Sequence, residues 1–539
     1  MKNNRYWAVL AALCLVIFLS GLGNLALTDP DETFYAQTSK EMLEAGDWVT
    51  PRIFGEPQYE KPIFHYWLVI SSYKIFGVNE FAARFPSAVL AILGILGIFL
   101  IARLLYSPLT GFLSAAIMAT SLEYLVVGKA CVTDMTLTVA IVYTLLFFLR
   151  GWVSGSKCSY FACAVSAAVA VLTKGPIGLF IPGAVILIYL SLTGQIRELF
   201  RRVPVFSSFL VFLAAALPWY AAVFMLDGKA FMDEFFGFHN ITRFIHPEHT
   251  IGDTPFFYLP VAIGGLFPWS VFFLFALWDI YGRKKNGMNM AVGQDGSLRS
   301  PKVFLAAWFL LVFLFFSASR TKLVTYILPL FPAMAIITGK FWADMAEGRV
   351  PGEKVRRALW FFSAVSLAAA AGALGLVWHE FPGSKAVIGA AIGSVVFIVS
   401  VLVSLRFLLK GKILGAFWAI IASVVLIIPP VIIYIFPPIE EYESRKALST
   451  ALKELAGPGE RVGAESDHRR GVAFYSGRID VEDIHPSEKR SEFFKDKNKV
   501  WGIIKIRHYE QVKQELKEKA PVEIKRSGKH VLVTNLPLS

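Results

Sequence analysis

Long apolar stretches, separated by short polar connections, fill the first 437 residues of the chain. A helix that crosses a bilayer needs about 20 mostly apolar residues. Stretches that fit this requirement lie at residues 7–27, 81–105, 109–127, 132–150, 158–173, 175–193, 204–225, 256–281, 302–318, 323–343, 358–378, 385–409 and 413–437. The first is longer than the apolar core of a secretory signal, so we expect a retained helix. The pattern predicts an all-α, multi-pass membrane domain of about 13 transmembrane helices over residues 1–437.

The pattern changes after Pro437-Pro438, where apolar runs become short and polar residues frequent. An amphipathic helix is predicted at 444–456, because the glycine and proline that follow it are helix-ending residues. The later short apolar runs are typical of a strand-containing fold with helices between. These runs lie at 471–475, 500–506 and 531–534, with a helical stretch at 508–519. We therefore predict a second, small α/β domain over residues 438–539.

One connection inside the membrane domain is long, at residues 28–80. It contains a helical stretch, 33–45, that is stopped by Gly46. A second stretch, 62–78, is rich in aromatic residues but shorter than a membrane span. Because Trp and Tyr prefer the membrane–water interface, we expect this second helix to lie along the membrane surface.

The composition agrees with a membrane protein and excludes several other classes. Hydrophobic residues make up 55% of the 539 residues and charged residues only 17%, whereas soluble domains carry roughly 25% charged residues. An ordinary soluble enzyme and a disordered chain are therefore excluded. The four cysteines lie in or beside apolar segments, which supports neither a disulfide framework nor a zinc finger.

The formal net charge of +13 is explained by membrane orientation rather than by nucleic-acid binding. With the N-terminus in the cytoplasm, the larger share of the lysines and arginines of the membrane domain falls in cytoplasmic loops, as the positive-inside rule requires. An odd number of spans then places the C-terminal domain on the outer, periplasmic side.

Ionisable residues near the predicted spans gather at their outer ends, and almost none lies in the middle of a span. Transporters place such groups near the bilayer midplane, where the substrate crosses. A ring of charges at one surface instead suits an enzyme whose substrate has its headgroup outside and its tail in the bilayer. We therefore favour an interfacial enzyme, with a transporter or flippase of a lipid-linked saccharide as the alternative.

Acidic residues at this surface are candidates for acid–base chemistry. Asp29, Asp31 and Glu32 directly follow the first span, and a carboxylate held there could deprotonate an acceptor hydroxyl. The alternative is that Asp31 caps the helix that starts at Thr33, with Glu32 in its first turn. Asp134 at the start of the fourth span is a second candidate, with a helix-capping role as its alternative.

Basic residues at the same surface suit a phosphate or diphosphate. Each of them alone would also fit an interfacial anchor, but several on one side, facing several acids, favour binding. Tyr326 lies on the same helical face as Lys322 and adds a hydroxyl, or is a tyrosine of the aromatic belt. The candidates are Lys61, Lys174, Arg243, Arg320, Lys322 and Tyr326.

Metal binding has weaker support in the sequence. His239, His246, His249, Glu248 and Asp253 share one outer loop, but their spacing matches no firm zinc pattern. Solvated loop residues are the alternative for this group. No cofactor is required by the sequence.

Several of these residues lie in motifs that resemble bacterial glycosyltransferases of the GT-C class, relatives of the protein O-mannosyltransferases. Lipid A aminoarabinose transferases are the nearest family. The motifs are TDPDETFY at 28–35, GDWVTPR at 46–52, EKP at 60–62, DM at 134–135, LTKGP at 172–176, HNITRF at 239–244, FYLP at 257–260, FPW at 267–269 and SRTKLVTYILP at 319–329.

The resemblance implies a GT-C-like enzyme of the bacterial inner membrane with an outward-facing cavity. Such enzymes move a sugar from undecaprenyl phosphate to lipid A or another envelope acceptor at the periplasmic face. By motif, Asp31 would be the catalytic acid or base and Asp134 a second essential acid. Lys61, Arg243 and Tyr326 would hold the donor phosphate, and Glu60 would help to bind a divalent metal if one is used.

Two departures keep the exact substrates open. Phe34 and Ile63 stand where many aminoarabinose transferases have a basic residue and a proline. Another sugar, or a protein or glycan acceptor, therefore stays an alternative within the same class. An O-antigen ligase would also work at the outer face, but it need not carry the motif of the first loop.

Overall fold

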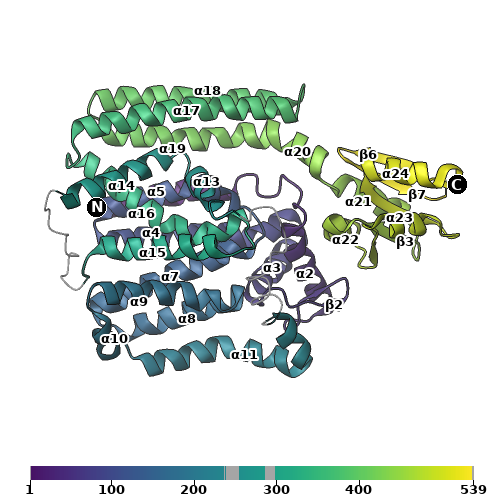
Figure 1. The fold of residues 1–539 in the computed structure, drawn as a ribbon, viewed down its shortest axis with the longest axis horizontal. Coiled ribbons are helices and arrows are strands. Elements are labelled where there is room, and N and C mark those ends of the chain that lie inside the picture. The colour runs from purple at the N-terminus through teal and green to yellow at the C-terminus, as the bar shows by residue number, and fades with distance from the viewer. Residues whose placement is uncertain (1, 236, 238–253, 286–297, 537–539) are drawn as a thin grey trace.

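The computed structural model describes residues 2–235, 237, 254–285 and 298–536. Most of the chain before residue 444 is a bundle of long helices that run side by side (Figure 1). Its helices are α1 (Lys2–Leu19), α4 (Glu80–Leu105), α5 (Pro108–Ala119), α6 (Leu122–Val127), α7 (Thr133–Ser154), α8 (Lys157–Lys174), α9 (Ile177–Leu192), α10 (Ile196–Arg202), α11 (Val205–Phe231), α13 (Tyr258–Gly265), α14 (Ser270–Lys285), α15 (Pro301–Ala318), η2 (Val324–Leu330), α16 (Phe331–Ala346), α17 (Gly352–Glu380), α18 (Lys385–Leu409), α19 (Ile413–Pro430) and η3 (Val431–Ile435).

Every apolar stretch predicted to span the membrane falls mainly on one of these helices or on consecutive ones. Within the described ranges, nine helices are long and apolar enough to cross a membrane, or up to 11 if each of two sharply bent pairs is one span. Two shorter apolar helices, Tyr6–Leu19 and Pro108–Ala119, add to these. The protein is therefore a mostly helical, multi-pass membrane protein, and the number of about 13 spans stays a prediction.

Local sequence explains where several helices begin and end. The side chain of Asn79 accepts a hydrogen bond from the amide of Ala82 and so caps α4. Helix α2 (Asp31–Ala45) ends at Gly46, whose φ of 68° suits a residue without a side chain. This stop was predicted from the sequence.

The long first loop forms a small helical layer at one end of the bundle. It contains α2, the two-stranded hairpin β1 (Arg52–Ile53) and β2 (Glu56–Pro57), and α3 (Phe64–Phe76). Helix α3 covers most of the aromatic stretch that was predicted at 62–78. Figure 1 shows α2 and α3 at the end of the bundle that faces the C-terminal region, while the N-terminus lies at the opposite end.

The C-terminal region is built on a five-stranded sheet of order β4-β3-β5-β7-β6. The β3 strand pairs in parallel with β4 and β5, whereas β7 pairs antiparallel with β5 and β6. After α20 (Phe436–Glu443), the elements are α21 (Lys446–Leu455), β3 (Arg461–Ala464), α22 (Arg469–Ser476), β4 (Val481–Asp483), α23 (Ser487–Phe494), β5 (Val500–Lys505), α24 (Ile506–Leu516), β6 (Val522–Ser527) and β7 (His530–Thr534).

One apolar run of this region is not a strand as we expected. Residues 471–475 lie in α22, whose inner face buries Val472 and Ala473 against the sheet. The strands lie on either side of this run, as β3 before it and β4 after it, and they are only four and three residues long. A run this short carries too little alternation to be told from a helix by its pattern.

Candidate active site

The N-terminus of α2 places three acids at the junction of the bundle, the first loop and the C-terminal region. Asp31 is the first residue of α2 and its side chain is exposed. It does not cap the helix as the alternative interpretation expected, because the helix begins at Asp31 itself and no side-chain cap bond forms there. An acid in the first turn is favourable near the positive end of the helix dipole.

Glu32 points the other way, into the bundle, where it forms a buried ion pair with Arg84 of α4. The two side chains are each 5% exposed and the Nη2–Oε2 distance is 2.7 Å. Burial alone would raise the pKa of Glu32, but the Arg84 charge and its hydrogen bonds lower it. The backbone amide of Cys131 also donates to Glu32, at 2.9 Å. This carboxylate therefore holds the first loop onto the bundle.

Asp29 faces the C-terminal region. Its side chain is 4% exposed, accepts a 2.5 Å hydrogen bond from Thr33 and lies 3.9 Å from both Arg445 and His468. A Cβ atom at Gly471 would lie 2.6 Å from Asp29 Oδ2, so the glycine lets α22 approach this carboxylate. Burial raises the pKa of Asp29 to about 6, against the lowering effect of Thr33 and Arg445.

Asp134 and Lys174 form a second ion pair at the same end of the bundle. Lys174 Nζ lies 2.5 Å from Asp134 Oδ1, with the two side chains 11% and 7% exposed. Thr325 donates to the other carboxylate oxygen at 3.2 Å. The Lys174 ammonium also lies 4.0 Å from the centre of the Tyr326 ring, a favourable cation–π contact. Helix α7 begins at Thr133 without a side-chain cap, so Asp134 does not act as a cap.

Lys61 and Glu60 lie on the connection between the β1–β2 hairpin and α3. Lys61 Nζ is 3.1 Å from Glu60 Oε1, and the Lys61 side chain is 11% exposed. Both residues contribute to the electrostatic field at Asp31. The structure therefore brings Asp31, Lys61, Asp134, Lys174 and Tyr326 to one place.

The remaining predicted cations differ in where they lie. Lys322 is buried, at 7% exposure, in the turn before η2, whereas Arg320 two residues earlier is exposed. Within the described part of the chain, neither forms an ion pair with the acids above. Arg243 lies outside the described residues, as does the predicted histidine group of the loop 238–253.

A metal site finds little support among the residues that the structure describes. No group of three or more His, Cys, Asp or Glu side chains there is arranged to hold a metal ion. Glu60, the predicted ligand, is already paired with Lys61. We therefore derive no chemical step through a metal.

Asp31 differs from Asp29, Glu32 and Asp134 in being exposed. Partial enclosure by protein raises the pKa of Asp31, and the negative charges of Asp134 and Glu60 raise it further. Lys61 and Arg470 oppose this shift. An exposed carboxylate with a raised pKa is a suitable general base.

Several residues at this site were not identified from the sequence. Arg84 lies inside a predicted span, where an arginine needs a partner, so its position was an available signal. His65 is fully buried and shares a 3.0 Å hydrogen bond with Thr136. Burial lowers the pKa of His65 to about 4, so the imidazole is neutral. Thr325 lies within the SRTKLVTYILP motif but was not singled out, and Arg470 carried no sequence signal.

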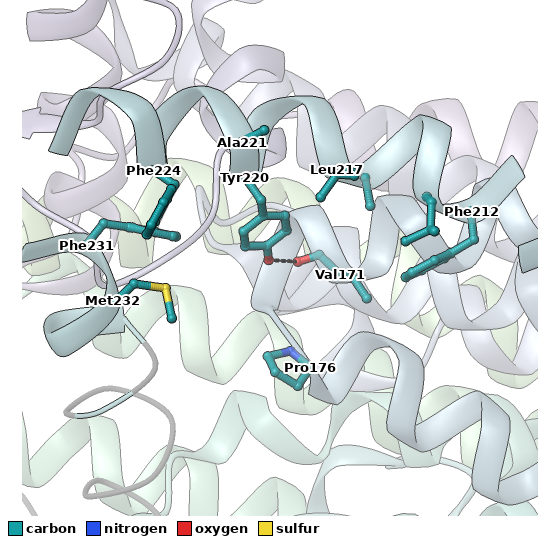
Figure 2. A pocket seen from close by; sticks show the side chains of 11 residues that line it. Val171, Pro176, Phe212, Leu217, Tyr220, Ala221, Phe224, Phe231 and Met232 are labelled. Carbon is teal, nitrogen blue, oxygen red and sulfur yellow. Dashed lines mark hydrogen bonds between the residues drawn. The ribbon is translucent and has the colours of Figure 1, made fainter. Parts of the chain in front are cut away.

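An apolar cavity of about 520 Å³ lies between α11 and the connection from α8 to α9. Val171 and Pro176, which flank Lys174 in the chain, form one wall, and α11 forms the other through side chains such as Leu217 and Phe224. Figure 2 shows Tyr220 pointing into this space, with its hydroxyl donating a 3.1 Å hydrogen bond to the carbonyl of Val171. The cavity therefore has an apolar lining and lies close in the chain to Lys174, which is not one of the lining residues.

Comparison with known proteins gives related sequences and folds. The family model described as dolichyl-phosphate-mannose-protein mannosyltransferase matches residues 60–221. The undecaprenyl phosphate-alpha-4-amino-4-deoxy-L-arabinose arabinosyl transferase of Aeromonas hydrophila is 32% identical over 65% of this chain and 62% of its own length. The same-named protein of Edwardsiella ictaluri is 31% identical over 62% and 59% of the two chains. The chain thus spans about 60% of the length of these curated relatives.

Solved structures match over nearly the whole chain. ArnT from Cupriavidus metallidurans, bound to undecaprenyl phosphate, has a TM-score of 0.80 and 23% identity over 98% of both chains. The archaeal oligosaccharyltransferase AglB of Archaeoglobus fulgidus has a TM-score of 0.55 and 13% identity over 94% of this chain and 70% of that one. The chain therefore has an ArnT-like fold and is similar in sequence to the aminoarabinose transferases, which confirms the resemblance predicted from the motifs of the first loop.

Proposed function

We propose that this protein is an integral membrane glycosyltransferase that moves a sugar from an undecaprenyl-phosphate donor to an acceptor such as lipid A. The observation that carries the proposal is the convergence of Asp31 with the Asp134–Lys174 pair and Lys61 at one end of an apolar helix bundle. The names of the relatives and the ligand of the ArnT structure support the same chemistry.

The donor would be held by its phosphate and its tail. Lys61 and Lys174 supply positive charge for the phosphate, and Tyr326 beside Lys174 supplies a hydroxyl. The apolar cavity between α11 and the α8–α9 connection suits part of a polyprenyl chain, which is favourable because apolar surface leaves water there. Arg243, Arg320 and Lys322 stay predictions for the same role.

Asp31 would act as the general base. It takes the proton from the acceptor hydroxyl as that oxygen bonds to the anomeric carbon of the sugar. The bond between that carbon and the donor phosphate breaks at the same time, and undecaprenyl phosphate leaves with the electron pair. Asp134 would not touch the proton; it orients Lys174 against the phosphate. Glu32 and Asp29 would hold the loop that carries Asp31.

Membrane placement follows from the same proposal. We infer an inner-membrane enzyme with the N-terminus in the cytoplasm and residues 438–539 forming a periplasmic α/β domain. The opposite positions of the two termini in Figure 1 support this arrangement. Cysteine accessibility labelling at each terminus of the protein in whole cells would test it.

Replacement of Asp31 by Asn tests the catalytic assignment. Loss of the base should reduce sugar transfer by about 10²–10⁴-fold, while the protein still inserts in the membrane. Glu44→Gln is the matched control, because Glu44 is an exposed acid near the other end of α2, and it should leave transfer unchanged. Full activity of Asp31→Asn would reject Asp31 as the base.

Mass spectrometry of lipid A and envelope glycans, from cells with and without the protein, identifies the acceptor. Loss of aminoarabinose from lipid A would support the substrates named above. Unchanged lipid A with altered protein or other glycans would assign a different acceptor. Directional movement of an intact lipid-linked saccharide across vesicles, without sugar transfer, would favour a flippase instead.

A further inference from the structure

Helix α22 of the C-terminal region lies directly against α2 of the first loop. The Leu27 amide donates a 2.8 Å hydrogen bond to the Tyr475 hydroxyl, and Lys40 donates a 3.3 Å bond to the Phe474 carbonyl. These contacts join residues more than 430 positions apart. They hold the last turn of α22 against α2, while Gly471 in its first turn lies against the Asp29 carboxylate, two residues before Asp31.

Arg470 in the first turn of α22 contacts residues on either side of Asp31 in the chain. Its Nη1 donates a 3.4 Å hydrogen bond to the Pro30 carbonyl. Its guanidinium also lies 4.6 Å from the centre of the Phe34 ring, close enough for a cation–π contact. Since Pro30 precedes Asp31 and Phe34 follows it by less than one helical turn, the guanidinium lies beside Asp31.

The other acids at this junction each have a cation of their own. Glu32 is paired with Arg84, Asp134 with Lys174 and Glu60 with Lys61. Asp29 lies near Arg445. In the described part of the chain, neither Asp31 nor Arg470 takes part in an ion pair within 4.0 Å. The Arg470 charge acts on Asp31 from a greater distance, and it acts on Asp29 as well.

The charged groups that face Asp31 come from three elements. Asp134 on α7 and Glu60 on the loop before α3 are negative, and Lys61 on that loop is positive. Of the positive groups, Arg470 on α22 has the larger effect on Asp31. Both Lys61 and Lys174 are already engaged by carboxylates, which leaves Arg470 to balance the charge of Asp31.

We propose that Arg470 is a positioning residue of the transferase site, which holds the first turn of α2 through Pro30 and Phe34 and balances the charge of the Asp31 carboxylate. The C-terminal region then completes the site rather than serving only as a separate binding module. This inference rests on the proposed role of Asp31 as the base. Because Arg470 acts through Asp31, its removal should change the pH at which Asp31 ionises as well as the rate.

Arg470→Gln and Arg470→Lys separate charge from shape. In Arg470→Gln the acidic limb of the pH–rate profile of sugar transfer should move up by about one pH unit. The reason is that a nearby positive charge no longer favours the ionised form of Asp31. Arg470→Lys keeps the charge and should keep the limb near its wild-type position. The assay uses undecaprenyl-phosphate-linked aminoarabinose and lipid A in detergent with the full-length protein.

A second measurement needs no substrate. Carbodiimide modifies protonated carboxyl groups, and its attachment to Asp31 can be followed by mass spectrometry as the pH is varied. The midpoint of modification should rise by about one pH unit in Arg470→Gln relative to wild type. Arg469→Gln is the matched control, since Arg469 is the adjacent residue of α22 but stacks on Phe54 at 3.7 Å, and it should leave the midpoint unchanged.

Each outcome decides a separate question. An unshifted midpoint and an unshifted acidic limb in a well-folded Arg470→Gln protein would overturn the inference, and so would an equal shift in Arg469→Gln. Full transfer by Asp31→Asn would instead overturn the proposed base, whatever the Arg470 variants do. Equal thermal unfolding midpoints of the Arg470 variants and wild type serve as the folding control.

Discussion

Two ion pairs lie at the same end of the bundle, yet their surroundings differ. In the Glu32–Arg84 pair all five N–H donors of the guanidinium are used, two by Glu32 and the others by the carbonyls of Leu22, Leu25 and Ala26. In the Asp134–Lys174 pair the ammonium instead lies over the aromatic ring of Tyr326.

The difference distinguishes an ion pair that stabilises the fold from one that is available for the reaction, although both belong to the same cluster of charges. Arg84 ties the carbonyls after α1 to the first turn of α2, and its fixed geometry leaves no donor for a ligand. Lys174 is instead a compact point charge with rotatable donors, the kind of group that can meet a phosphate. We therefore expect the first pair to determine stability and the second to determine activity.

The largest effect should come from Arg84→Met. Removing one partner of a buried, fully hydrogen-bonded pair leaves the Glu32 charge unbalanced and should lower the free energy of unfolding by about 3–5 kcal/mol. Thermal unfolding in detergent measures this loss. The control is Arg357→Met, whose exposed pair with Glu353 lies on α17 and should contribute less than about 1 kcal/mol. Equal effects of the two variants would contradict a structural role for Arg84.

A second, more selective effect is expected from Lys174→Met. Loss of a cation aimed at the donor phosphate should reduce the transfer rate by about 100-fold, with a smaller drop in unfolding temperature than in Arg84→Met. Parallel measurements of rate and unfolding temperature on both variants make the test. If the Lys174→Met protein is unstable but fully active per folded molecule, Lys174 stabilises the fold, as Arg84 does, and has no role in the reaction.

The smallest effect concerns Asp29, a third buried acid of the same loop. Its pKa of about 6 in the folded protein exceeds the value of about 3.9 in an unfolded chain, so folding binds a proton between these values. The contribution of Asp29 to the free energy of unfolding is fully present below about pH 4, and it is lost as the pH rises through 6. Asp29→Asn should remove that loss, on the order of 2 kcal/mol at pH 7.

Unfolding temperatures of wild type and Asp29→Asn, measured from pH 4 to 7, check this sign. The advantage of the variant should grow with pH and level off above about pH 6. Parallel curves for the two proteins would show that the Asp29 pKa does not differ between the folded and unfolded states.

The sequence predicted the helical bundle well, because about 20 apolar residues in a row match the thickness of the hydrocarbon core of a bilayer. It also predicted that acids and bases meet at one surface, and the motifs of the first loop predicted the family resemblance. The aromatic stretch at 62–78 was assigned as a helix too short to span, and α3 agrees with that assignment.

The sequence could not tell which neighbouring acid would face which partner. Asp31 and Glu32 are adjacent, so about 100° of helix rotation separates one exposed carboxylate from one buried on Arg84. Packing of α2 against α3 and α22, together with the Glu32–Arg84 pair, decides that direction, and no local pattern records it. Arg470 was missed for a related reason, since its contact with Pro30 spans 440 positions of the chain.

The contacts between the first loop and the C-terminal region also determine when the site can form during translation. The first loop is made long before α22, but its bonds to Tyr475 and Arg470 exist only when the C-terminal region has been made. A ribosome that has completed α19 has produced every long helix of the bundle without these bonds. A nascent chain therefore gains its finished site last, after the bundle is in the membrane.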